Sequence, residues 1–185
     1  MTDVSRTANV CASIFTTLAI LGMSSPLQDD PGNRVNQVKA VFLYNFTQFI
    51  EWPESSFDNA NSPFVIGVLG KNTFGVYLDD VIESEKVNGH PIIIKYFTGI
   101  TPDIGECKIL FIDKSFPAVE QAVKNTKGKP ILTVSDNEYF MKQSGILRFY
   151  IEDGKLRIEI NQEISSNSGL AISSKLLRIA ALYKK

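Results

Sequence analysis

The segment that most constrains the fold is the run "ILRFYIEDGKLRIEIN", because its pattern defines a β-hairpin over residues 146–160. Asp153-Gly154 lies at its centre, and an Asp-Gly pair between two alternating runs favours a two-residue turn. Such a turn pairs Glu152 with Lys155, Tyr150 with Arg157 and Arg148 with Glu159 on one face, and Ile151 with Leu156, Phe149 with Ile158 and Leu147 with Ile160 on the other. The second face is apolar throughout, so we expect it to pack on the core while the charged face meets water.

Before the hairpin, short apolar runs alternate with segments of helical periodicity. Buried strands are predicted at "PFVIGVL" (63–69), "HPIIIKYF" (90–97), "KILFID" (108–113) and "KPILTVSD" (129–136). Helices are predicted over 35–50, 74–82, 116–125 and 137–142, and the apolar segment 165–182 is predicted to form one C-terminal helix. This order predicts an α/β fold with a mostly parallel central sheet, covered by helices on both faces and carrying the hairpin at one edge.

Residues 1–25 have the pattern of a secretory signal peptide. Arg6 precedes an uncharged run whose apolar centre, Val10–Met23, is too short to span a bilayer, and small residues follow it. A buried helix is the alternative, but the run lacks a polar face. Residues 26–34 then form a polar leader, and residues 35–185 form a single domain large enough to bury its own core. We therefore expect a periplasmic protein that does not span the membrane once its signal is removed.

Charge and cysteine content narrow the class of protein further. The chain has 19 basic and 20 acidic residues, which leaves no basic excess for binding nucleic acid. Of its two cysteines, Cys11 lies in the signal segment, so Cys107 alone remains and no internal disulfide can form. Cys107 adjoins the apolar run 109–112, and we expect it to be buried and inert rather than a reactive thiol.

No residue pattern indicates catalysis, a metal ion or a cofactor. His90 is the only histidine and is expected in a solvated turn, with no Gly-x-Ser-x-Gly motif to supply a nucleophile. One histidine and one cysteine do not make a convincing zinc site, and the acidic residues around Asp79 fit the solvated face of a helix. The glycines at Gly70 and Gly75 lack the Lys-Ser/Thr of a phosphate-binding loop. An enzyme is therefore the least expected class.

Polar residues follow three of the predicted parallel strands, namely Asn72 and Thr73, Ser115, and Asp136. Ligands of such sheets bind outside the carboxyl ends of the strands, where free backbone N–H groups can hold an anion. These four residues are therefore candidates for a small-molecule site. The alternative is that Thr73, Ser115 and Asp136 are ordinary helix N-caps.

The chain resembles the YfiR-type periplasmic proteins over essentially its whole length after residue 35. The matching segments, in order, are "AVFLYNFTQFIEWPESSF", "PFVIGVLGKNTFG", "NGHPIIIKYF", "CKILFIDKS", "PILTVSD" and "LRIEINQEISSNSGLAISSKLLRIAALYK". No single motif is decisive, so the resemblance depends on the order and spacing of all of them.

This resemblance implies an exported α/β domain without catalytic activity, often a dimer. The best-known members of the family repress a membrane-bound diguanylate cyclase by binding the periplasmic sensor region of the cyclase, and they release the cyclase under envelope or redox stress. Other members are expected to serve sensor kinases or outer-membrane receptors. Members of the family often carry a cysteine in the first strand, where this chain has Gly67. That departure leaves Cys107 without a partner and argues against redox sensing by a disulfide within one chain.

The leading hypothesis is an exported, non-catalytic regulator of an inner-membrane signalling protein. Its expected contact surface combines the corner Trp52-Pro53 with the C-terminal residues Ser173, Ser174, Lys175, Leu176 and Arg178. Surplus apolar area with Lys175 and Arg178 at its rim has the composition of an interface. Two alternatives stay open: both segments only close the core, or the protein binds a small molecule at the strand ends and serves a sensor kinase or outer-membrane receptor.

Overall fold

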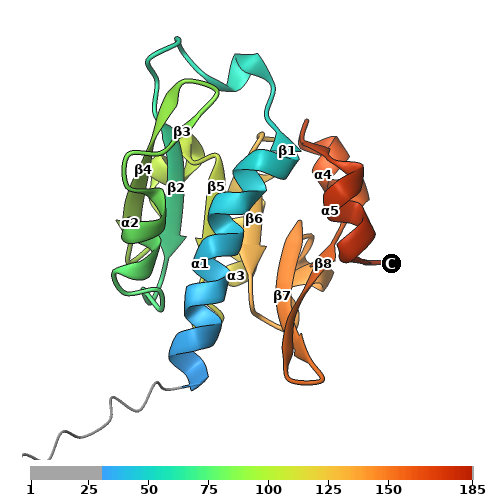
Figure 1. Cartoon of the computed structure of the whole chain (residues 1–185). Coiled ribbons are helices and arrows are strands. Elements are labelled where there is room, and N and C mark those ends of the chain that lie inside the picture. Colours follow the sequence, from blue (N-terminus) through green and yellow to red (C-terminus); the bar gives the residue numbers. More distant parts are fainter. Residues whose placement is uncertain (1–30, 185) are drawn as a thin grey trace, which may run out of the picture.

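The computed structural model describes residues 31–184, and Figure 1 shows how their elements are arranged. The helices are α1 (Pro31–Phe49), α2 (Tyr77–Ile82), α3 (Val119–Thr126), α4 (Gln162–Asn167) and α5 (Ser174–Ile179), with short 3-10 helices η1 (Glu54–Ser56), η2 (Pro102–Glu106) and η3 (Phe140–Gln143). The strands are β1 (Ile50–Glu51), β2 (Phe64–Leu69), β3 (Lys86–Val87), β4 (His90–Phe97), β5 (Ile109–Ile112), β6 (Leu132–Ser135), β7 (Leu147–Glu152), β8 (Lys155–Ile160), β9 (Ala171–Ile172) and β10 (Ala181–Leu182).

Eight strands form one mostly parallel sheet in the order β10-β8-β7-β6-β5-β2-β4-β3. From β4 through β2, β5 and β6 to β7 all neighbours are parallel, whereas the β7–β8 and β3–β4 pairs are antiparallel. The chain passes from β2 to β4 on one side and then to β5 on the other, so the winding switches between β2 and β5. The predicted α/β class is confirmed.

The side chains of the central strands contribute to two separate hydrophobic cores, one on each face of the sheet. Ile66 and Val68 of β2 join the core under α1 and α2, whereas Val65 and Leu69 join the core under α3. Every position of β2 is therefore buried, which explains why the strand is a continuous apolar run without alternation. Figure 1 shows α1 crossing in front of the sheet, with α4 and α5 beside the β7–β8 hairpin.

The predicted hairpin is confirmed at all of its cross-strand pairs. Asp153 and Gly154 adopt φ values of 51° and 69°, as a two-residue turn between twisted strands requires. On the apolar face, the Phe149 ring stacks on Phe46 of α1 at 5.9 Å between centroids. Packing against α1 therefore buries Phe149, but Ile151 of the same face is 54% exposed, so the predicted burial of this face fails near the turn.

The prediction of one C-terminal helix over 165–182 is wrong, because the segment forms α4, β9, α5 and β10. Gly169 has φ 76°, and this left-handed turn lets the Leu170 N–H reach the Ser165 carbonyl at 3.1 Å, which ends α4. The Ser173 hydroxyl then accepts the Leu176 N–H at 3.4 Å and starts α5. These stop and start signals override the apolar periodicity of the segment.

The first helix starts earlier than predicted. α1 begins at Pro31 rather than at Val35, so residues expected in the polar leader are helical. Proline suits the first turn of a helix because its missing N–H would have no partner there. The predicted signal peptide lies outside the described residues.

Candidate functional site

A pocket of about 470 Å³ opens at the carboxyl ends of β2, β5 and β6. Its polar groups come from the loops after these strands and from Asn36 and Lys39 of α1, and most of its apolar wall comes from the hairpin. The residues that line it are Gly32, Val35, Asn36, Lys39, Thr73, Asp113, Lys114, Asp136, Phe149, Tyr150, Ile151 and Leu156. We call it the strand-end pocket. It lies beside the point where the winding switches, which is where doubly wound sheets bind their ligands.

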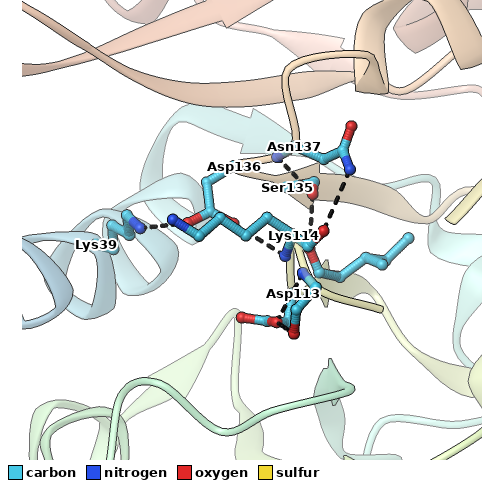
Figure 2. Close-up of polar contacts among 8 residues, drawn as sticks. Lys39, Asp113, Lys114, Ser135, Asp136 and Asn137 are labelled. Carbon is cyan, nitrogen blue, oxygen red and sulfur yellow. Dashed lines mark hydrogen bonds and ion pairs between the residues drawn. The ribbon is translucent and has the colours of Figure 1, made fainter. Parts of the chain in front are cut away.

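Lys39 joins α1 to the strand ends. Its Nζ lies 2.6 Å from Asp136 Oδ2, and the two side chains are only 8% and 13% exposed (Figure 2). The second oxygen of Asp136 accepts the backbone N–H of Lys114 at 3.2 Å. A buried ion pair adds little net stability but is costly to break, so this pair fixes α1 over the end of β6.

Hydrogen bonds at the ends of β5 and β6 hold Asp113 and the residues around it. Asp113 is 2% exposed, and its Oδ1 accepts both the backbone N–H and the hydroxyl of Ser115. Ser135 Oγ donates to the Ile112 carbonyl at 2.7 Å and accepts the Asn137 N–H at 3.1 Å (Figure 2). The ends of β5 and β6 are thereby tied to each other.

The interpretation of Thr73, Ser115 and Asp136 as helix N-caps is wrong. The N-cap residues of α2, α3 and η3 are Val76, Ala118 and Tyr139. The helices start later than the sequence predicts, because tight turns follow the strands first. One such turn closes where Asn72 Oδ1 accepts the Phe74 N–H at 3.0 Å.

Of the four predicted ligand residues, Thr73 and Asp136 line the strand-end pocket, whereas Asn72 and Ser115 do not. The Thr73 Oγ1 atom is buried and makes no hydrogen bond to any described residue. Sequence reasoning missed Lys39 and Asp113. Lys39 could have been found, because it interrupts the apolar stripe of the first helix with a charge.

Trp52 packs at the end of the core, just after α1. Its Nε1 donates to the Lys108 carbonyl at 3.0 Å, and its ring meets Phe64 edge-on at 4.9 Å between centroids. The indole is partly buried against the core under α1. Trp52 therefore has a packing role, whatever else binds there.

The structure brings the Trp52-Pro53 corner next to the C-terminal segment. β1 pairs with β9, and the Ser173 N–H donates to the Phe49 carbonyl at 2.8 Å. Ser173 caps α5, and Leu176 is 1% exposed, so these two predicted contact residues stabilise the fold.

The other predicted contact residues of this segment, Ser174, Lys175 and Arg178, are exposed. Beside them, Ile179 and Leu182 are 64% and 47% exposed, and sequence reasoning did not single out either as a contact residue. We call Ser174, Lys175, Arg178, Ile179 and Leu182 the C-terminal surface. The prediction of one helix over 165–182 could not place this surface. α5 ends at the C-cap Ala180, and Leu182 belongs to β10 rather than to a helix.

Cys107 and His90, the candidate nucleophile and the only histidine, both pack against other parts of the fold. Cys107 is buried as predicted, and its burial raises the pKa of the thiol to about 12. His90 does not lie in a solvated turn but begins β4, where its Nδ1 is 2.7 Å from the Ser62 carbonyl. Its ring stacks on Phe57 at 4.0 Å.

Within residues 31–184, no group of three or more His, Cys, Asp and Glu side chains could hold a metal ion. None of the helices in that range is long and apolar enough to cross a bilayer. Residues 36–181 match the model of the family described as YfiR/HmsC-like. The chain belongs to the YfiR/HmsC-like family. Its proteins are periplasmic, regulatory and non-catalytic, and they are associated with partner proteins in the membrane. No curated protein matches the chain.

Proposed function

We propose that this YfiR/HmsC-like protein is an exported regulator that binds the periplasmic sensor region of an inner-membrane signalling protein of the diguanylate cyclase type. The family match over residues 36–181 carries the proposal. Regulation occurs by binding alone: the bound partner is repressed, and its release raises cyclic di-GMP.

The proposed contact site is the C-terminal surface together with the Trp52-Pro53 corner. Ile179 and Leu182 supply exposed apolar area from two adjacent elements, and Lys175 and Arg178 supply a basic rim. An apolar centre with arginine at its edge is the composition that interfaces favour. The Arg178 Nε donates to the Ser174 carbonyl at 3.4 Å, which orients the guanidinium along the helix. The basic rim would steer the protein toward an acidic patch on its partner.

Affinity capture from envelope extracts tests this proposal. The tagged protein should recover an inner-membrane protein with a cyclase or kinase output domain. Arg178→Glu should weaken that complex about tenfold, or about 1.4 kcal/mol, because it reverses the charge at the rim. Lys127→Glu is the matched control, since it reverses an exposed charge at the end of α3. Equal recovery by both variants would contradict the proposed surface, and recovery of no membrane protein would contradict the function.

A second candidate function is small-molecule binding in the strand-end pocket. It is favoured by the buried Thr73 hydroxyl, which bonds no residue within 31–184, in a pocket that also contains the Lys39–Asp136 pair. A ligand at a hundred times its Kd raises the unfolding free energy by about 2.7 kcal/mol, so thermal-shift screening with nucleotides, amino acids and vitamins can detect it. A hit should lose its shift in Thr73→Val, which removes the hydroxyl and keeps the shape. If no compound shifts the melting temperature, this second candidate is wrong.

A further inference from the structure

One edge of the large sheet is open along most of its last long strand. On its inner side, β4 pairs with β2 over Ile92–Phe97. On its outer side, β3 covers only His90 and Pro91. Figure 1 shows β4 at the margin of the sheet, with the short β3 at one end of it. The open edge therefore begins beyond the Ile92 N–H, at the far end of the sheet from β10.

The direction of the backbone groups shows which residues are free at this edge. The Ile92 N–H points outward, since it donates to the Glu85 carbonyl at 3.2 Å, whereas the Phe97 carbonyl points inward and accepts the Gly70 N–H at 2.8 Å. The direction alternates along a strand, so Ile94 and Tyr96 also point outward. No described residue bonds their backbone groups. Two consecutive outward positions therefore offer N–H and C=O groups to a further strand.

This edge has few of the features that normally protect one. Edges are commonly blunted by proline, bulges or charged side chains, but residues 92–97 contain no proline and only one charge, Lys95. The Lys95 Nζ is 2.6 Å from Glu106 of η2, the element that precedes β5, so this charge is paired within the chain. Ile93 and Tyr96 are 37% and 46% exposed. The exposed strand is thus apolar as well as unpaired.

Acidic side chains lie beside this edge on the face of the sheet that carries α2. Tyr96 Oη donates to Asp79 Oδ2 at 2.7 Å, so an acidic group lies over one end of the open stretch. At the other end the Glu85 backbone carbonyl accepts the Ile92 N–H, while the Glu85 carboxylate accepts the Tyr44 hydroxyl of α1 at 2.7 Å. Asp80 and Glu83 are exposed beside them, and Lys86 is the nearby exposed base. We call Asp79, Asp80 and Glu83 the acidic rim.

We propose that the outer edge of β4 binds an extended, positively charged segment of another protein by strand addition. Main-chain bonds to Ile94 and Tyr96 would provide affinity, and alternate side chains would provide selectivity. Side chains on the α2 face would meet the acidic rim and should be basic, whereas those on the other face would meet Ile93 and should be apolar. The proposal goes beyond the regulatory function, because the C-terminal surface lies at the opposite end of the sheet.

A second copy of this chain fits the edge less well. A twofold antiparallel pair with Ile94 opposite Tyr96 of the other copy would set Lys95 opposite Lys95. It would also bring two acidic rims together. Like charges directly opposed across strands are destabilising. The charge pattern therefore favours a basic partner strand over self-pairing.

Hydrogen exchange followed by NMR tests the proposal with two synthetic peptides. The probe is acetyl-Lys-Val-Lys-Val-Lys-Val-amide, and the control carries Glu in place of each Lys. With the probe at about ten times its Kd, the amides of Ile94 and Tyr96 should exchange about tenfold more slowly, because only the unbound fraction exchanges. The amides of Ile93 and Lys95 already face β2 and should not change. The control peptide should have no effect.

Three results would overturn the proposal. The first is unchanged exchange at Ile94 and Tyr96 with millimolar probe. The second is protection of both amides in the free protein together with a doubled mass, which would show that a second copy occupies the edge. The third comes from comparing two variants. Asp79→Asn should weaken probe binding about threefold, because it removes one rim charge. Asp153→Asn at the hairpin tip should leave probe binding unchanged. Equal binding by both variants would refute the role of the acidic rim.

Discussion

Position 67 offers a test in which two substitutions at one site have opposite effects. A Cβ atom added at Gly67 would lie 2.6 Å from Cys107 Sγ, 3.0 Å from Leu110 Cδ1 and 3.1 Å from Phe97 Cε2. All three neighbours belong to the core under α3. Gly67→Ala should therefore overpack that core and lower the unfolding free energy by about 1–3 kcal/mol.

Gly67→Cys should instead form a disulfide with Cys107 under oxidising conditions. Standard disulfide geometry places the Cβ of one cysteine about 3 Å from the Sγ of the other, so a shift of a few tenths of an ångström completes the bond. The bond would close a loop of about 40 residues and constrain the unfolded chain by up to about 4 kcal/mol. The resemblance to YfiR-type proteins points to the same two positions.

Urea unfolding followed by the fluorescence of Trp52 measures both effects, because it is the only tryptophan. In a Cys107→Ala background the cost of Gly67→Ala should shrink, since the nearest atom is gone. Oxidised Gly67→Cys should lose the free thiols at positions 67 and 107 and unfold at higher urea than its reduced form. A neutral Gly67→Ala, or free thiols that persist at these two positions after oxidation, would refute the packing described for this face.

Three further predictions follow from single contacts. Trp52→Phe should cost about 1 kcal/mol, because it removes the hydrogen bond to Lys108, and an unchanged urea midpoint by far-UV circular dichroism would contradict this. Lys39→Met should lower the unfolding free energy by about 3–5 kcal/mol, because it leaves Asp136 without its ion-pair partner. The double variant Lys39→Met with Asp136→Leu should cost less than Lys39→Met alone. Additive costs of the two changes would contradict the pairing. The raised pKa of Cys107 means that the folded protein favours the neutral thiol. The difference in unfolding free energy between wild type and Cys107→Ala should therefore be constant below pH 9 and fall from there toward pH 12. A difference that does not change with pH would contradict this.

The hairpin and the central strands could be predicted from sequence because their signals are local. Asp153-Gly154 sets both the turn and the register, and continuous apolar runs identify strands that are buried on both faces. The strand ends could be predicted to meet, because parallel neighbours finish at the same edge. Thr73 and Asp136 do line one pocket there.

The C-terminal segment and the deeper pocket residues could not be predicted in the same way. Apolar periodicity over 165–182 is satisfied equally by one helix or by two short ones, and Gly169 and Ser173 decide between them. The partner of Lys39 depends on how α1 crosses the sheet, which is a long-range fact. The open edge of β4 follows only from strand order, since the apolar pattern of 90–97 is the same for an edge strand and a central one.

The most direct test of the regulatory account is the cyclic di-GMP level of cells in which this protein is the only variable. Deletion should raise cyclic di-GMP, the wild-type protein and Lys127→Glu should restore the low level, and Arg178→Glu should fail to restore it. Far-UV circular dichroism and the urea midpoint should show that both variants fold normally. Full restoration by Arg178→Glu would contradict the proposed contact surface, and an unchanged level after deletion would contradict the proposed function itself.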